Sequence, residues 1–165
     1  MATREDFCAE AKALASDHGI YLWSGNGELT EGLTVGSIRA KESSLENAAR
    51  VLRFIASCYA NGYDMTKSRA CDCSGAVVYI LRKLAFIKPT ADYRARDLQA
   101  MCKKVRLDKL KPADLVFNQT TGATHVGIYI GSNLVVEAQG RDKGIVLRSL
   151  AAGSWVTGGQ LPYFK

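Results

Sequence analysis

Cys73 is the residue best placed for nucleophilic chemistry, because it stands where a polar turn meets an unbroken apolar run. The run, residues 76–81, is apolar on all sides, which is typical of a buried helix. Asp72 is a suitable N-cap for that helix. Cys73 then lies in the first turn, where free backbone N–H groups and the helix dipole favour a thiolate nucleophile. A small cysteine that only fills the core is the alternative interpretation.

A thiolate mechanism also needs a base, and the chain contains two histidines, His18 and His125. His18 ends a predicted N-terminal helix, whereas His125 begins a strand whose alternation can point the imidazole toward a cleft. Counting through the following hairpin from His125 leads to a partner near Glu137. This carboxylate can orient the imidazole and stabilise its protonated form. A Glu137 that faces solvent is the alternative.

Three segments are similar to the NlpC/P60 family of cysteine peptidases, and the resemblance extends over residues 70–150. They are Asp72-Cys73-Ser74-Gly75, Leu110-Lys111-Pro112-Ala113-Asp114-Leu115-Val116-Phe117 and His125-Val126-Gly127-Ile128-Tyr129-Ile130-Gly131. The resemblance implies a papain-like fold, in which N-terminal helices pack on a central antiparallel sheet. It also implies that the enzyme cuts peptidoglycan stem peptides with a nucleophile at the start of a buried helix.

A fourth segment, Gly19–Gly27, resembles the family's Tyr-x-Trp-Gly-Gly loop, with Ser24 in place of the first glycine. Tyr21 is then a candidate to line the substrate cleft. The resemblance further implies that Asp72 and Ser74 recognise the free amine of the substrate's L-alanine. The alternatives are a half-buried Tyr21 with a solvated hydroxyl, and an Asp72 and Ser74 that only begin the helix.

The order of the segments predicts the α+β class, with helices first and an antiparallel sheet after them. We expect a helix over residues 3–18 with Thr3 as N-cap, the cysteine helix, and a short basic helix over 93–104. Residues 28–69 are longer than the family's usual passage to the cysteine. Their capping box, Ser43-x-x-Glu46, predicts a further helix that ends before Gly62.

Four segments have the pattern of strands: Asp114–Asn118, His125–Ile130, Leu134–Ala138 and Ile145–Arg148. The short connection Gly131-Ser132-Asn133 predicts that the second and third form an antiparallel hairpin. At this length we expect one domain, residues 1–165, with 28–69 as a helical elaboration within it.

Composition limits the classes of function. The chain is 47% hydrophobic and 23% charged, which is typical of a globular protein. Its net charge of +6 fits a polyanionic partner, but the basic residues are scattered and lack an aromatic platform, so we expect no nucleic-acid binding. No apolar run reaches the roughly 20 residues of a membrane span, so we expect no membrane insertion. The five cysteines predict free thiols, and Cys71-x-Cys73 alone does not predict a metal site.

We therefore expect a monomeric peptidoglycan hydrolase that cuts between γ-D-glutamate and a diamino acid through an acyl-enzyme on Cys73, without metal or cofactor. The alternatives are an N-acetylmuramyl-L-alanine amidase or an acyltransferase with the same triad, and a non-enzymatic wall-binding or phage structural module. The first residues, Met1–Asp6, lack the basic and apolar regions of a signal peptide. We therefore expect synthesis in the cytoplasm and action on the cell wall after release, or after delivery by a phage particle or a secretion machine.

Overall fold

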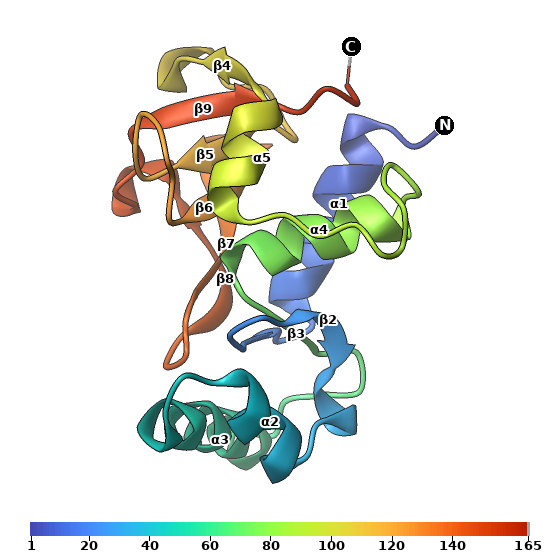
Figure 1. The fold of residues 1–165 in the computed structure, drawn as a ribbon, viewed down its shortest axis with the longest axis vertical. Helices are drawn as coiled ribbons and strands as arrows, with labels where there is room; N and C mark the ends of the chain where they lie inside the picture. The colour runs from blue at the N-terminus through green and yellow to red at the C-terminus, as the bar shows by residue number, and fades with distance from the viewer. Residues whose placement is uncertain (165) are drawn as a thin grey trace.

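The computed structural model describes residues 1–164 and has the expected α+β architecture. An antiparallel sheet has the strand order β4-β9-β5-β6-β7-β8. Its strands are β4 (Lys103–Val105), β5 (Leu115–Phe117), β6 (Val126–Gly131), β7 (Leu134–Gly140), β8 (Gly144–Ser149) and β9 (Thr157–Gln160). The N-terminal helix α1 (Arg4–Ser16) and the cysteine helix α4 (Cys73–Lys83) pack together against this sheet (Figure 1).

The main hydrophobic core lies between these two helices and the sheet. Val77, Ile80 and Leu81 of α4 are fully buried there, together with Phe7 of α1 and Phe117 of β5. Full burial of one such side chain stabilises the fold by roughly 1.5–3 kcal/mol. The apolar run after the cysteine therefore anchors the start of α4, and with it Cys73, to the rest of the molecule.

The predicted hairpin between β6 and β7 is confirmed. Ile128 pairs with Val136 and Tyr129 pairs with Val135. The connecting residues Ser132 and Asn133 both have left-handed backbones, with φ angles of 52° and 57°. This conformation matches the right-handed twist of a two-residue hairpin, and asparagine tolerates it well.

A second, mixed sheet joins the main body to the elaboration at residues 28–69. It has the order β1-β3-β2, formed by β1 (Ile20–Tyr21), β2 (Asn26–Leu29) and β3 (Arg69–Cys71). The helices α2 (Val35–Lys41) and α3 (Leu45–Ala60) form a lobe beyond this sheet, in teal at the bottom of Figure 1. We call the set of residues that fills this lobe the small core; its buried members are Ile20, Leu22, Ile38, Ala48, Val51, Cys58, Met65 and Ala70.

Two predicted helix starts have different outcomes. Thr3 caps α1 as expected, in a capping box with Asp6. The capping box predicted from Ser43 and Glu46 is wrong, because Ser44 is the N-cap of α3 and accepts a hydrogen bond from the backbone N–H of Asn47 at 3.1 Å. Ser43 and Ser44 can cap a helix equally well, so the sequence pattern predicted Ser43 although the structure uses Ser44.

Several boundaries also differ from the prediction. The basic helix expected over 93–104 is α5 (Ala95–Met101), since Lys103–Val105 leaves the helix to pair with β9. Neither α2 nor β9 was predicted. Three 3-10 turns complete the described elements: Thr30–Gly32, Leu107–Lys109 and Leu150–Ala152. Within residues 1–164, no helix has both the length and the apolar character that crossing a bilayer requires.

Candidate active site

Cys73 is the first residue of α4 and lies at the surface of a cleft, where it is partly exposed. Asp72 is the N-cap, as predicted, and its Oδ1 accepts a hydrogen bond from the backbone N–H of Gly75 at 2.7 Å. A Cβ at Gly75 would lie 1.8 Å from the carbonyl oxygen of Gly25. A glycine is therefore needed for the loop after β1 to lie against the helix start. Cys71, by contrast, is fully buried, and burial raises the pKa of its thiol.

The imidazole of His125 is positioned by Asn118 at the end of β5. Asn118 Oδ1 accepts hydrogen bonds from the backbone N–H groups of Thr124 at 3.1 Å and His125 at 3.0 Å. Its Nδ2 donates to Thr124 Oγ1 at 2.8 Å. The Cys73 thiol donates to the Thr124 carbonyl oxygen, with a distance of 3.9 Å between Sγ and oxygen. One amide side chain therefore holds the turn that brings the imidazole to the thiol.

Glu137 lies next to the imidazole of His125. His125 Nε2 lies 3.1 Å from Glu137 Oε2, and the Glu137 side chain has no exposed surface. In the β6–β7 register, Glu137 is the diagonal neighbour of His125 on the same face of the sheet, rather than its direct partner. The structure thus brings Cys73, His125 and Glu137 together in one chain of contacts.

The electrostatics of this chain favour a protonated imidazole. Burial lowers the pKa of His125, but hydrogen bonds and charges from Cys73 and Glu137 outweigh it and raise the pKa to about 9. Imidazolium then predominates at neutral pH. Such a group can hold a thiolate beside it and donate its proton to a leaving amine.

Arg148 of β8 was not among the predicted site residues. Its Nη2 lies 2.6 Å from Glu137 Oε1, so the buried carboxylate has a cation on the side opposite His125. The contact is a close ion pair rather than an aligned hydrogen bond, since Oε1 has no hydrogen-bond donor in the described residues. Glu137 pairs with Val146, which places Arg148 two residues further along β8 on the same face.

Trp155 is a second residue that the sequence analysis missed. Its ring stacks on the His125 imidazole with centroids 5.3 Å apart and planes 11° apart. A Cβ at Gly127 would lie 2.9 Å from the Trp155 ring, so this glycine leaves the space that the indole occupies. Together the indole and Glu137 restrict the orientation of the imidazole.

Tyr21, Asp72 and Ser74, the predicted substrate-binding residues, all line the same cleft as Cys73. Burial raises the pKa of Tyr21 to about 12, and the nearby Cys73 and Asp72 add to the shift. Asp72 Oδ2 accepts a hydrogen bond from the backbone N–H of Ser24 at 3.0 Å. Ser24 has a left-handed backbone with φ of 58°, a conformation that favours glycine. Ser24 is also the position at which this chain has a serine where the resembling family has the first glycine of its loop.

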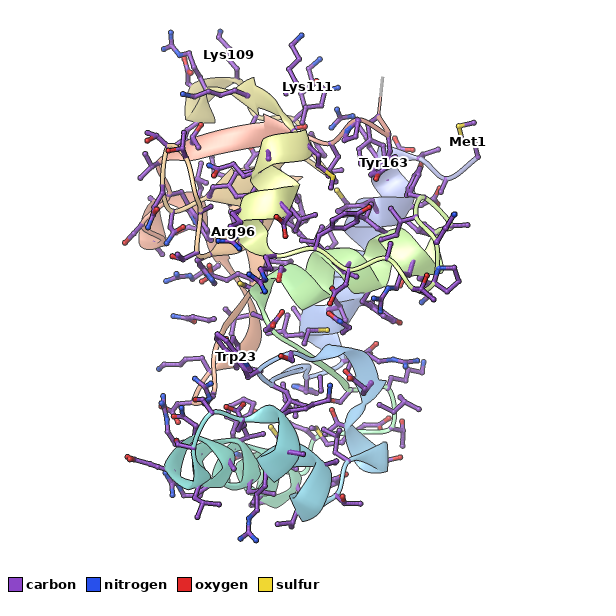
Figure 2. All side chains as sticks on the ribbon, viewed as in Figure 1. Met1, Trp23, Arg96, Lys109, Lys111 and Tyr163 are labelled. Carbon is purple, nitrogen blue, oxygen red and sulfur yellow. The ribbon has the colours of Figure 1, made fainter. Side chains whose placement is uncertain are left out.

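The cleft has a volume of about 860 Å³ and runs between the main body and the loops around the small sheet. Trp23, at the junction with the lobe, and Arg96, at the start of α5, belong to its two sides (Figure 2). Its lining includes four arginines, Arg50, Arg94, Arg96 and Arg141, but only two carboxylates, Asp72 and Asp92. The excess of guanidinium groups suits an anionic ligand.

The described residues show no grouping of three or more His, Cys, Asp or Glu side chains that could hold a metal ion. All five cysteines are free thiols.

Comparison with known proteins relates the chain to one family. Residues 59–158 match the NlpC/P60 family. The chain is 34% identical over 91 residues to the murein DD-endopeptidase MepH of Escherichia coli. The matched stretch is 51% of this chain and 32% of that protein. The chain is also 33% identical over 94 residues to the gamma-DL-glutamyl hydrolase of Bacillus subtilis, covering 54% and 22%. The chain spans less than a third of the length of the curated relatives it matches.

Solved structures share the fold. The NlpC/p60 domain of the peptidoglycan hydrolase SagA matches with a TM-score of 0.62 and 15% identity, over 97% of this chain and 100% of that one. RipD of Mycobacterium tuberculosis, a non-catalytic NlpC/p60 domain protein, matches with a TM-score of 0.60 and 13% identity, over 97% and 98%. The family match over more than half of the sequence and the shared fold lead to one conclusion: the chain belongs to the NlpC/P60 family.

Proposed function

We propose that the chain is a cysteine endopeptidase that cuts the bond between γ-D-glutamate and a diamino acid in peptidoglycan stem peptides. The observation that carries this proposal is the contact chain from the Cys73 thiol through His125 to the buried Glu137. A core histidine needs neither a thiol partner nor an open cleft, and His125 has both. The MepH and gamma-DL-glutamyl hydrolase relatives are named for related cleavages.

The proposed reaction uses these groups in two stages. The Cys73 thiolate attacks the carbonyl carbon of the γ-glutamyl group, forming a C–S bond, while the His125 imidazolium gives its proton to the leaving amine as the C–N bond breaks. The neutral imidazole then takes a proton from water, and the hydroxide breaks the C–S bond to release the glutamyl carboxylate. The backbone N–H of Cys73 and the Tyr21 hydroxyl are the proposed donors to the oxyanion.

Substrate binding is proposed for Tyr21, Asp72 and Ser74. The Asp72 carboxylate accepts bonds from Gly75, Ser24 and Ser74, and burial raises its pKa. A carboxylate in a poorly solvated site favours a cation over a neutral group, which fits a free L-alanine amine. Stem peptides already released from muramic acid should then be cut faster than sugar-linked ones. A preference of kcat/KM for the sugar-linked form would contradict amine recognition.

The test of the activity is digestion of purified peptidoglycan with the products identified by mass spectrometry. The proposal predicts fragments that end in γ-D-glutamate and fragments that begin with the diamino acid. Intact stem peptides freed from sugar would instead identify an amidase. RipD shows that this fold also occurs without catalysis, so no release of fragments would favour a wall-binding module.

A further inference from the structure

Arg141, in the turn between β7 and β8, has the more buried of the two ion pairs made by the four cleft arginines. Its Nε donates to Oε2 of Glu42 at 2.7 Å, and its Nη2 lies 2.7 Å from the same oxygen. Glu42 comes from the elaboration, between α2 and α3, and its side chain has no exposed surface. The other carboxylate oxygen of Glu42 accepts the backbone N–H of Trp23 at 3.0 Å. The elaboration therefore clamps a guanidinium group at the edge of the cleft.

The clamp also fixes this group relative to the thiol. The Arg141 Cζ atom lies 5.2 Å from the centre of the Tyr21 ring, and Tyr21 lines the same cleft as Cys73, whose charge helps to raise the pKa of Tyr21. Arg141, Tyr21 and Cys73 thus line one cleft. Its Nη1 makes no hydrogen bond or ion pair within residues 1–164, although the Arg141 side chain is only 15% exposed. A fixed guanidinium with a free nitrogen in a cleft is suited to an incoming carboxylate.

We propose that Arg141 is a specificity residue that binds the α-carboxylate of the γ-glutamyl residue whose bond is cut. The inference rests on the proposed function, since that function places Tyr21 on the amine side of the scissile bond. Arg141 stacks on Tyr21, and the charged group of a stem peptide between its amine and that bond is the glutamyl α-carboxylate. Binding costs little side-chain ordering, because Glu42 and Tyr21 already hold the guanidinium in one place.

The other cleft arginines are arranged differently. Arg50 is bound by Asp142 through Nε and Nη2, at 2.6–3.2 Å. The guanidinium groups of Arg94 and Arg96 lie at the start of α5 without an ion pair in the described residues. An exposed, unclamped arginine must lose side-chain freedom when it binds, so Arg94 and Arg96 are less suited to discrimination. Arg94 and Arg96 are the alternative residues that could bind the same carboxylate, so the experiment includes variants of both.

The experiment compares two γ-D-glutamyl peptides that differ only at the glutamyl α-position, one with a carboxylate and one with a carboxamide. The wild-type chain should cut the carboxylate form with a kcat/KM about 10- to 100-fold higher, the range for a hydrogen bond to a charged group. Arg141→Gln should lose this preference chiefly by slowing the carboxylate peptide. Arg106→Gln removes an ion-paired arginine outside the cleft and should keep the preference.

Arg141→Gln leaves Glu42 buried without its partner, which destabilises a fold. The double variant Glu42→Gln/Arg141→Gln removes both charges and is the second arm. Equal cutting of both peptides by the wild type would overturn the inference but leave the proposed function intact. Loss of preference in Arg94→Gln or Arg96→Gln, with Arg141→Gln unchanged, would also overturn it. If neither peptide is cut, the proposed function fails, and calorimetric binding of the two peptides to Cys73→Ala still tests Arg141 by the same preference.

Discussion

The two hydrophobic cores of the molecule serve the cleft in different ways. The main core holds the start of α4 and the strands β6 and β7, and so places Cys73, His125 and Glu137. The small core holds α2, α3 and Ile20 of the strand β1, and so places Glu42, which holds Arg141 at the edge of the cleft. We infer that the first core controls the rate of bond cleavage and the second controls which peptide is cut. The predictions below test that division, from the largest expected effect to the smallest.

The largest contrast is between the two histidines. His125→Ala should reduce kcat by at least about 10³-fold, because the proton donor and acceptor of the reaction is lost. His18→Ala should stay within a few-fold of wild type, since His18 stacks on Tyr63 at 4.0 Å and does not line the cleft. The measurement is kcat for both variants, with circular dichroism to show that both are folded. Equal losses of kcat in two folded variants would mean that His18, which packs on the elaboration at residues 28–69, contributes to bond cleavage.

Glu137 should give an intermediate effect. Glu137→Gln keeps an acceptor for the imidazole but loses the charge, and we expect kcat to fall by roughly 10- to 10³-fold. Glu137→His should retain more activity than Glu137→Ala, because a neutral histidine can still accept a hydrogen bond from the imidazole. Steady-state kinetics of the three variants measures these differences. Full activity in Glu137→Ala would mean that another residue orients the imidazole of His125.

Arg148 should matter less than Glu137, because it acts through the carboxylate rather than on the imidazole. Arg148→Gln leaves the buried Glu137 Oε1 without a cation, and we expect a loss of about 3- to 30-fold in kcat with KM unchanged, the range of one charge-assisted contact. Arg106→Gln is the matched control for the loss of one positive charge. A rise in KM with constant kcat would instead assign Arg148 to substrate binding.

The pH dependence follows from the raised pKa of His125. The imidazolium form predominates below about pH 9, so the alkaline fall of kcat/KM should lie near pH 9 rather than near 6.5. In Glu137→Gln the carboxylate no longer favours the imidazolium, and this fall should move to lower pH. The same ion pair stabilises the fold fully below about pH 6.5, and that contribution is lost as the pH rises through about 9. Equilibrium unfolding at both pH values measures this contribution to stability. If the alkaline fall of kcat/KM in Glu137→Gln stays near pH 9, Glu137 is not the group that raises the pKa of His125.

The smallest effect on the chemical step is expected from the small core. Ile38→Ala removes a fully buried side chain there and should lower the free energy of unfolding by about 2–5 kcal/mol. Below the unfolding temperature, kcat should stay within about threefold of wild type, because the reactive chain rests on the other core. Denaturant titration and kinetics at 15 °C provide both values. A loss of kcat as large as that of Glu137→Gln would show that the two cores are not separable.

The proximity of Cys73, His125 and Glu137 could be predicted because its signals are local. An aspartate before a cysteine and an apolar run predicts a helix start, and a short turn between two strands places Glu137 near His125. Arg148 could not be found in this way, because its place beside Glu137 depends on the register of a third strand. Trp155 lies in a loop before β9, and only the small Gly127 across from it reflects its position.

The lobe was harder to predict than the main body. Its helix α3 has a strong apolar period, but α2 is short and β1 to β3 are two to four residues each, too short for a periodic pattern to show. Nothing in the sequence distinguishes Glu42 from an ordinary surface carboxylate. Its burial against Arg141 depends on the packing of two segments that are 99 residues apart in the sequence. The contact between Glu42 and Arg141 was therefore outside what local patterns can indicate.

The most direct test of the account compares two cysteines that stand two residues apart. Cys73 opens into the cleft, whereas Cys71 is fully buried in β3. With a γ-D-glutamyl peptide as substrate, Cys73→Ala should show no turnover while it keeps its fold and still binds the peptide. Cys71→Ala should keep kcat/KM within a few-fold of wild type after correction for any loss of folded protein. A folded Cys73→Ala that still cuts the peptide, or a folded Cys71→Ala as inactive as Cys73→Ala, would contradict the assignment of Cys73 as the nucleophile.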